Sequence, residues 1–498
     1  MAPRTSPTVA LVRFAPWMYF TNSHPRDLLW PVSMLYAQAL ARQAGWRAEI
    51  IDLHVERFDE DALARRVKAI APDVLLMDST TPTMAAARRL AARLKDRHPD
   101  LRLWGVGQHA SEVPGDLLYP GTPFDGCLLG EYDAILPQLL SGADLAGRDD
   151  VAVAGEAFQA QHPGRARAQI SDPDRLPPID PGGLHLERYE MRSLHAPTFR
   201  RQRWGYLLTS RGCPHRCVFC SPTLRQSYGH HFRAHSAERV VDDMARLGRD
   251  HGVTSVYMLD DAFSLQRQRV LDICALLIRR SIRLHWAIQT RADDLDPELL
   301  AALHEAGCHG VKVGYESGVD RILKQLRKGT SRELLLRTAR DIRRAGLSLT
   351  ACYILGNPTE TLEDMEETFR FAKQVGSDMI QVSFHTPYPG SESFEKYRAQ
   401  IHRASHMSHY DHQEVIVSDI PRDRLEEEQR RFYRRYYLSP PRLWSYLSRR
   451  ALYRAFDPDE WKLLVDTLRY LHLPAEYKGP PDSPSPPTTT SPPHKPPR

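Results

Sequence analysis

One segment distinguishes this chain from an ordinary α/β sequence: YLLTSRGCPHRCVFC, residues 206–220. A short apolar run ends in a glycine, and Cys213, Cys217 and Cys220 follow within eight residues. Structural zinc usually takes two pairs of ligands, whereas three thiolates in one loop leave a coordination position open. Thiolates are the usual ligands of iron–sulfur clusters. The spacing therefore predicts a cluster with one iron free for another ligand; the alternatives are His215 as a fourth ligand and a structural zinc ion.

The same segment opens a series of strand–helix repeats that extends to about residue 395. Six short apolar runs predict strands, and five amphipathic stretches predict helices between them. The strands are expected at 206–210, 255–259, 284–289, 311–315, 349–355 and 379–384, and the helices at about 236–249, 265–280, 296–306, 331–345 and 361–375. This alternation predicts a partial (β/α)6 barrel, whose chemistry lies at the carboxyl ends of the strands.

An earlier alternation predicts a second α/β unit at the N-terminus. Its strands are expected at 9–14, 48–53, 74–77, 101–106 and 126–130, with helices between them, as in a doubly wound, Rossmann-like sheet. Ligands of such sheets bind beyond the carboxyl ends of the strands. Small or polar residues occupy those ends: Ser79, Thr80, Gly105, Gly107, Gly130 and Glu131. Ordinary βα turns are the alternative interpretation.

Composition divides the chain into five segments. We expect an N-terminal domain at 1–145, a Pro- and Gly-rich linker at 146–200, the barrel at 201–395, a helical extension at 396–478 and a disordered tail at 479–498. In the extension, LEEEQRRFYRRYYL predicts a helix with Phe432, Tyr436 and Tyr437 on its packed face.

The cysteine loop resembles the signature of the radical S-adenosylmethionine (radical SAM) superfamily. Three further stretches resemble that superfamily's later strands and loops: 291–318, 353–368 and 386–394. The N-terminal domain resembles the cobalamin-binding domain that is fused to one large subgroup. The matching pieces there are 45–53, 72–81, 105–111 and 130–140.

The resemblance implies a set of cofactor contacts. Cys213, Cys217 and Cys220 would bind a 4Fe-4S cluster, and Phe219 would lie along the adenine of SAM. The other SAM contacts are expected at the ends of the second to fourth strands: Asp260 or Asp261 for the amino group, and Arg291, Glu316 and Ser317 for the carboxylate or ribose. A helix N-cap for the aspartates and a rim salt bridge for Glu316 are the structural alternatives.

Two departures from the subgroup pattern matter. Thr359 stands where the fifth-strand loop commonly has glycine, which leaves the local turn open. Asp52-Leu53-His54 lacks the glycine and the position of the D-x-H-x-x-G motif through which some domains hold cobalt. We therefore expect cobalamin without a histidine ligand from the protein; whether cobalamin is bound at all stays open from the sequence.

The resemblance implies a cobalamin-dependent radical SAM methyltransferase. An electron from the cluster would cleave SAM to a 5′-deoxyadenosyl radical, and methylcobalamin would methylate an unactivated carbon, or phosphorus, of a small biosynthetic intermediate. The alternatives are a rearrangement or cyclisation with the same cofactors, and an N-terminal domain that serves only as a scaffold or a binding module for a partner or RNA. An electron donor such as flavodoxin or ferredoxin is the expected partner.

Charge and hydropathy exclude other classes. A net charge of +5 over 498 residues gives no reason to expect a nucleic-acid partner. No apolar run reaches the length of a membrane span, and no signal-peptide pattern starts the chain. With 7 sparse cysteines, we expect a reducing, cytoplasmic location.

Overall fold

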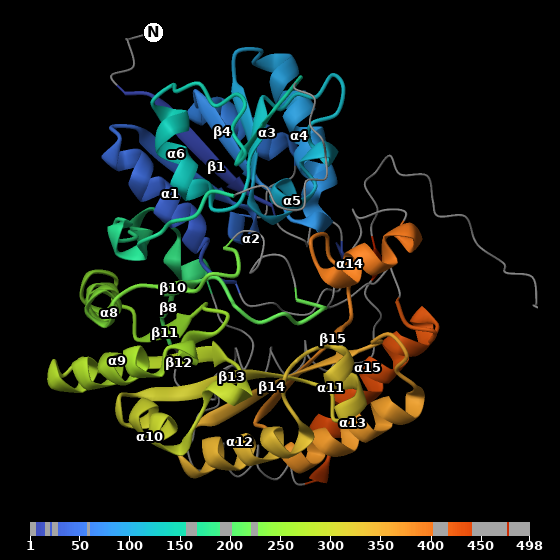
Figure 1. Ribbon diagram of the computed structural model, residues 1–498. Helices are drawn as coiled ribbons and strands as arrows, with labels where there is room; N and C mark the ends of the chain where they lie inside the picture. Colours follow the sequence, from blue (N-terminus) through green and yellow to red (C-terminus); the bar gives the residue numbers. More distant parts are fainter. Residues whose placement is uncertain are drawn as a thin grey trace, which may run out of the picture.

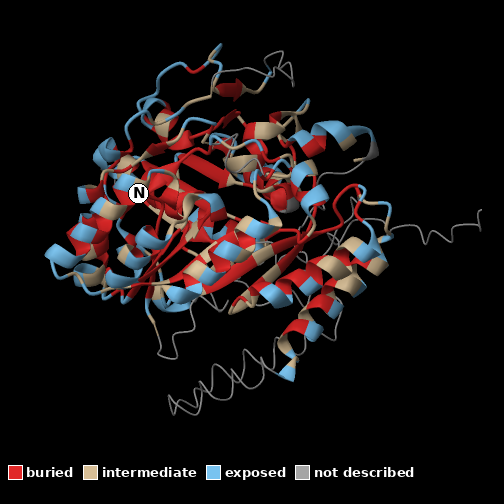
Figure 2. Ribbon diagram, turned by 60° about the horizontal axis from the view of Figure 1, so that its bottom comes forward, coloured by how far each residue is buried: buried red, intermediate tan, exposed pale blue. Residues whose placement is uncertain are grey.

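The computed structural model describes residues 6–14, 20–21, 28–56, 60–155, 167–189, 202–220, 228–401, 417–440 and 476–477. Two six-stranded sheets, one from each half of the chain, dominate these residues (Figure 1). Most residues of the strands are buried, while the helices bury one face and expose the other (Figure 2). Within the described residues, no helix is long and apolar enough to cross a lipid bilayer.

The N-terminal sheet is doubly wound, as predicted. Its strand order is β3 (Arg47–Asp52), β1 (Thr8–Arg13), β4 (Val74–Asp78), β5 (Arg102–Val106), β6 (Gly126–Leu128) and β7 (Val151–Val153). The first five strands are parallel, and β7 runs antiparallel to β6. The sequence analysis placed residues 151–153 in the linker; the chain uses them as an edge strand.

Helices cover both faces of this sheet. One apolar core joins the sheet to α1 (Val32–Gln43) and α6 (Tyr132–Leu140), and the other joins it to α3 (Glu60–Ile70), α4 (Met84–Arg97) and α5 (Gly107–Glu112). Short α2 (Leu53–Glu56) follows β3 directly. Because parallel strands leave their carboxyl ends at one edge, α2 and α5 begin at the edge where ligands of such sheets bind.

The second sheet is a six-stranded parallel partial barrel, which confirms the predicted architecture. Its order is β15 (Met379–Phe384), β14 (Ser348–Leu355), β13 (Cys308–Glu316), β12 (His285–Thr290), β11 (Ser255–Met258) and β8 (Trp204–Leu207). Its main helices are α8 (Ala237–His251), α9 (Arg267–Arg279), α10 (Pro297–Glu305), α12 (Arg332–Arg344) and α13 (Leu362–Val375). A small hairpin, β9 (Ser210–Arg211) and β10 (Arg233–Ala234), and the helices α11 (Asp320–Gln325) and α14 (Glu392–Tyr397) lie at the strand ends.

Local capping explains where several of these helices begin. The N-cap side chains of α8, α10, α12 and α13 each accept a hydrogen bond from the helix backbone; they are Ser236, Asp296, Ser331 and Thr361. Such caps satisfy backbone amides that a helix leaves without partners. These signals are local in sequence, so the predicted helix limits fall within a few residues of the observed ones.

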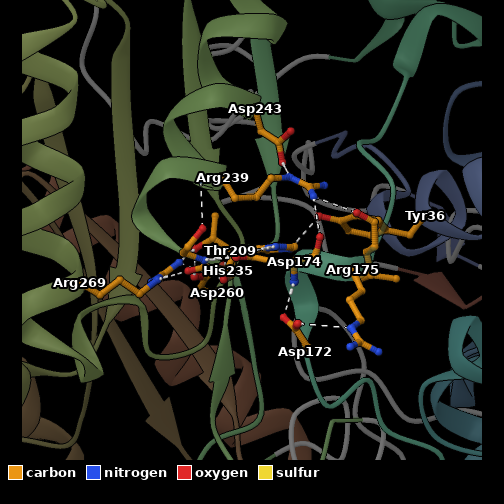
Figure 3. A network of polar contacts seen from close by, with 12 residues as sticks. Tyr36, Asp172, Asp174, Arg175, Thr209, His235, Arg239, Asp243, Asp260 and Arg269 are labelled. Carbon is orange, nitrogen blue, oxygen red and sulfur yellow. Dashed lines mark hydrogen bonds and ion pairs between the residues drawn. The ribbon is translucent and has the colours of Figure 1, made fainter.

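The described part of the linker, residues 167–189, holds the two halves together. Tyr189 donates a hydrogen bond to Asp52 in the N-terminal sheet (2.9 Å). Asp174 lies 3.1 Å from Nδ1 of His235, whose Nε2 is 3.3 Å from the Tyr36 hydroxyl on α1 (Figure 3). One buried histidine therefore connects the N-terminal domain, the linker and the barrel.

The C-terminal helix α15 (Arg422–Tyr437) packs along the edge strand β15 and buries Phe432 and Tyr436. The hydroxyl of Tyr433 accepts a hydrogen bond from Val382 N (2.8 Å), and that of Tyr437 accepts one from Ile380 N (2.9 Å). Side chains thus satisfy backbone groups that a seventh strand would otherwise pair.

Farther along the extension, β16 (Glu476–Tyr477) pairs antiparallel with β2 (Phe20–Thr21). The predicted tail, residues 479–498, lies outside the described residues. The predicted limits of the five segments stay predictions.

Candidate cofactor site between the two sheets

The cysteine loop follows β9 at the carboxyl end of β8. Cys213 and Cys217 are buried and Cys220 is half-buried. Gly212 has a φ of +82°, and a Cβ there would lie 2.2 Å from the carbonyl oxygen of His231, so only glycine fits before the first cysteine. The Val218 amide donates to the Leu326 carbonyl (3.1 Å), which fixes the loop against the barrel.

The donor set of this loop fits an iron–sulfur cluster. It offers three thiols on one short segment, and none of them forms a disulfide. In the parts of the chain that the structure describes, no three His, Cys, Asp or Glu side chains converge on a single metal ion. Each thiolate of a cubane binds a different iron, so cluster ligands need no such common point.

The ends of β12 and β13 bring a second group of predicted residues to the loop. Arg291 Nη1 donates to Cys217 Sγ (3.6 Å). Glu316, with a φ of +60°, accepts a hydrogen bond from Lys328 Nζ (2.7 Å). Lys328 Nζ also lies 5.9 Å from the centre of the Phe219 ring.

Lys328 was missed from the sequence, because it follows α11 in a loop and ends no strand. It is buried; burial alone would lower its pKa, but the charge of Glu316 raises it. A charged lysine therefore lies among the predicted SAM contacts.

The two aspartates at the end of β11 have different surroundings. Asp260 is fully buried and accepts hydrogen bonds from Thr209 N (2.6 Å) and Ser210 Oγ (2.8 Å), while Arg269 also donates to Thr209 (Figure 3). Asp260 thus fixes the chain just before the cysteine loop.

Asp261, by contrast, is only half-buried, and no hydrogen bond or ion pair is seen for it among the described residues. Burial of its carboxyl group raises its pKa well above the usual range, and the charge of Asp260 adds to this effect. Of the two aspartates, Asp261 has the carboxylate available to a ligand beside the loop.

Ser317 contacts protein groups. Its hydroxyl lies 3.2 Å from Thr368 Oγ1 and accepts a hydrogen bond from Val319 N (3.2 Å). These contacts fix the turn between β13 and α11.

In the N-terminal domain, Ser79 provides the clearest fit to a ligand. It lies directly after β4, is fully buried, and its Oγ has no hydrogen-bond partner among the described residues. Thr80 instead forms a capping box with Thr83. An unsatisfied buried hydroxyl at the carboxyl end of a central strand is the kind of group that a bound cofactor can complete.

The glycines at the neighbouring strand ends have separate roles. A Cβ at Gly105 would lie 2.7 Å from Leu117 Cδ1, so the missing side chain there allows protein packing. Gly107 has a φ of +88°, and a Cβ there would lie 2.1 Å from Asp78 Oδ1. Gly130 has a φ of +86° and donates its amide hydrogen to Ser111 (2.9 Å). Gly107 and Gly130 keep the backbone close to the ligand edge of the sheet.

A buried ion network joins the two strand-end regions. Arg211, two residues before Cys213, donates to Glu131 Oε2 (2.8 Å) and to Asp133 Oδ2 (2.7 Å). Arg233 pairs with the other oxygen of Glu131 (2.6 Å). Side-chain exposure is 2% for Arg211, 0% for Glu131 and 5% for Asp133. Glu131, predicted as a ligand contact, therefore links the end of β6 to the cysteine loop.

The ends of β14 and β15 complete the site. His385 lies between Asn357 (Nδ1 to Oδ1, 3.0 Å) and Ser393 (Nε2 to Oγ, 2.7 Å), with its ring 6.5 Å from that of Phe219. The Ser393 amide donates to the carbonyl of Val218 inside the cysteine loop (3.1 Å). Both strand ends were expected to carry chemistry, but the hydrogen bonds that join them to the loop connect residues far apart in sequence.

The structure shows the conformation of the fifth-strand loop, which the sequence left open. Thr359 has a φ of +61°, the conformation that glycine adopts most readily. The neighbouring Glu360 is buried and accepts a hydrogen bond from Asn357 N (2.9 Å), and burial raises its pKa to about 8. Threonine therefore adopts here a left-handed conformation that is rare for a β-branched residue.

Two family models match this chain over the regions just described. The model of the B12 binding domain matches residues 25–140, and that of the Radical SAM superfamily matches residues 207–372. The chain thus combines a B12-binding domain with a radical SAM domain. These domains identify its cofactors as cobalamin, a 4Fe-4S cluster and SAM.

Its curated relatives include methyltransferases and cyclases. An uncharacterised methyltransferase of Pyrococcus horikoshii is 27% identical over 73% of this chain and 78% of its own length. The anaerobic magnesium-protoporphyrin IX monomethyl ester cyclase of Rubrivivax gelatinosus is also 27% identical, over 74% of this chain and 66% of its own length. The cytidylyl-2-hydroxyethylphosphonate methyltransferase of Streptomyces wedmorensis is 24% identical over 75% of this chain and 78% of its own length.

Solved structures share the fold. The radical SAM methyltransferase TsrM of Kitasatospora setae, with cobalamin and a [4Fe-4S] cluster bound, aligns with a TM-score of 0.61 at 20% identity, over 80% of this chain and 79% of its own. The cobalamin-dependent SAM radical enzyme OxsB aligns with a TM-score of 0.65 at 16% identity, over 94% of this chain and 71% of its own. The two-domain arrangement is therefore one that known proteins adopt.

Proposed function

We propose that this protein is a cobalamin-dependent radical SAM methyltransferase that methylates a carbon, or phosphorus, of a small-molecule substrate. The observation that carries the proposal is the buried network of Arg211, Glu131 and Asp133. It holds the end of β6 in the B12-binding domain against the start of the cysteine loop. The two cofactor regions then face one substrate position, and proximity replaces an encounter between separate molecules.

The residues assigned to the cofactors follow from the site. Cys213, Cys217 and Cys220 hold the cluster, and Phe219 and Asp261 contact SAM. In the B12-binding domain, Ser79 and the backbone at Gly107 and Gly130 contact cobalamin. When bound, the cluster and SAM supply a hydrogen-abstracting radical, and cobalamin supplies the methyl group.

The protein's own residues orient these groups and exclude water. The contact from the Ser393 amide to Val218 and that from Val218 to Leu326 hold the cysteine loop from both sides. The helix α14 lies close to the N-terminal domain (Figure 1), and its Glu395 is near enough to Glu112 for its charge to act on that carboxylate. A radical reaction needs an enclosed site, because water and side reactions compete for the reactive species.

Product balance tests the proposal. The anaerobically reconstituted protein is supplied with hydroxocobalamin, methyl-deuterated SAM, a one-electron donor and a pool of candidate substrates. A methyltransferase yields S-adenosylhomocysteine and 5′-deoxyadenosine together, and the methyl label enters the product.

A variant with Cys213, Cys217 and Cys220 replaced by alanine should lose its iron and both products. The matched control, Cys352→Ala, should keep its iron. Full iron in the triple variant would refute the cluster assignment.

Cyclisation is the second candidate, because a cyclase is as similar to this chain as the first methyltransferase relative. It needs the same two-domain geometry, so the fold does not separate the two reactions. Turnover that forms 5′-deoxyadenosine and product without S-adenosylhomocysteine or methyl label identifies the cyclase. A small acidic electron-transfer protein, such as flavodoxin or ferredoxin, is the proposed electron donor.

A further inference from the structure

Arg291 has a guanidinium group that the protein holds in a fixed orientation. Its Nε and Nη2 donate to the two oxygens of Asp293 (2.9 and 2.7 Å), and Nη2 also donates to the carbonyl of Lys328. The remaining nitrogen, Nη1, donates to Cys217 Sγ (3.6 Å). The residue is buried. The sequence predicted Arg291 as a contact for the carboxylate or ribose of SAM, but here it contacts a cysteine of the cluster loop.

We propose that Arg291 raises the reduction potential of the cluster through its hydrogen bond to Cys217, and that it is not the group that binds the SAM carboxylate. The step concerned is the transfer of one electron from a flavodoxin- or ferredoxin-class donor to the cluster, which passes from the 2+ to the 1+ state. No bond forms or breaks in this step, and no proton moves. The proposal rests on the cluster assignment and holds equally for methyl transfer and for cyclisation.

The physical reason is that reduction adds negative charge to the cluster and its sulfur ligands. Hydrogen bonds to the sulfurs stabilise the more negative state and so raise the potential. A buried donor acts more strongly than one in water, because little solvent screens it. Asp293 binds the far side of the guanidinium and is 29% exposed, so the pair presents its positive end to the sulfur.

The neighbouring lysine is a weaker candidate for this role. Lys328 Nζ lies 2.7 Å from Glu316, and both side chains are less than one-tenth exposed. Among the described residues, Lys328 makes no hydrogen bond to a loop sulfur, so its charge acts on Cys217 without a direct contact. Arg291, with a nitrogen directed at the sulfur itself, is therefore the residue whose loss should change the potential most.

A potentiometric titration of the reconstituted protein, followed by electron paramagnetic resonance, tests the proposal. Arg291→Gln removes the charge, and Arg291→Lys keeps it without the fixed geometry. Arg267→Gln is the matched control, because Arg267 at the start of α9 forms a partly exposed ion pair with Asp296. Iron per chain and the dissociation constant of SAM are measured in parallel. In Arg291→Gln we expect about a tenfold shift toward the oxidised cluster, which is about 59 mV for one electron.

The expected result includes a smaller shift for Arg291→Lys, none for Arg267→Gln, and SAM affinity within about twofold of the unchanged protein. An unchanged potential with full iron in Arg291→Gln would overturn the proposal. So would tenfold weaker SAM binding without a change in potential, since Arg291 would then act as a SAM ligand. If Arg291→Gln loses its iron, the potential and the SAM affinity of Arg291→Lys are judged by the same criteria. Absence of iron from the unchanged protein would refute the cluster itself.

Discussion

Replacing Arg211 by leucine should open the contact between the two domains. The change removes three hydrogen bonds, at 2.8, 3.1 and 2.7 Å, and leaves Asp133, with 5% side-chain exposure, without a hydrogen-bond partner among the described residues. Glu131 keeps its pair with Arg233. Breaking a buried ion pair by removing one partner costs about 3–5 kcal/mol, because the other charge stays buried.

Hydrogen exchange with mass spectrometry measures this loss of stability in the segments that form the contact. Peptides that span 126–136 and 204–213 should lose about two to nearly four orders of magnitude of protection, since each factor of ten corresponds to about 1.4 kcal/mol. Removing both charges, with Arg211→Leu and Asp133→Leu together, should restore much of the protection, because no charge is then left buried without a partner.

The surface variant Arg267→Leu is the control. Its ion pairs are 41–75% exposed, and such pairs contribute at most about 1 kcal/mol. If Arg211→Leu reduces protection no more than this control does, the reasoning about the interface is refuted.

Three further predictions concern single residues. Gly107→Ala should destabilise the N-terminal domain, because a Cβ would lie 2.1 Å from Asp78 Oδ1, and it should reduce the cobalt retained on gel filtration with hydroxocobalamin. In the control Gly142→Ala, φ is +76° but no atom is close, so thermal denaturation should show a loss of only about 1–2 kcal/mol in the free energy of unfolding. Burial lowers the pKa of His385 from 6.5 to about 4, so below pH 6.5 the unfolded chain binds a proton that the folded protein does not bind. The free energy of unfolding should therefore fall by about 3 kcal/mol for this residue as the pH drops from about 6.5 to about 4. Urea midpoints across that range should vary less in His385→Gln, and parallel curves would contradict the assignment. Tyr433→Phe should cost about 1–3 kcal/mol in urea unfolding, because it leaves an edge-strand amide without its acceptor; no loss would mean that water replaces the hydroxyl.

The architecture could be predicted because its signals are local. Buried strands read as short apolar runs, and serine, threonine and aspartate caps mark the helix starts. The strand at 379–384 was predicted to the residue, and the cysteine spacing indicated the loop that we propose as the cluster site. The three-residue strand β7 was missed, since it is too short for a pattern and lies in a Pro- and Gly-rich region.

The site was harder to predict because its contacts join residues far apart in sequence. Arg211 and Asp133 are 78 residues apart, and nothing near either residue indicates the other. Sequence position alone did not separate Asp260, which fixes the backbone, from Asp261, whose carboxyl group has no hydrogen-bond partner among the described residues. Lys328 lies outside every strand end, so a search limited to strand ends misses it.

The helix α15 has a consequence for how this enzyme can be divided or recombined. One edge of the second sheet, β15, is covered by side chains of α15. On the other side, Trp30, which precedes α1, packs on Tyr206 of β8, and the same apolar core includes Tyr36 of α1 and Tyr189 of the linker. Cutting the gene at the ends of the barrel would expose one edge to pairing with other chains and leave the other side of the core open. The radical SAM half is thus not a transplantable module; a lineage that gains or loses the N-terminal domain must also replace what covers each side of the sheet.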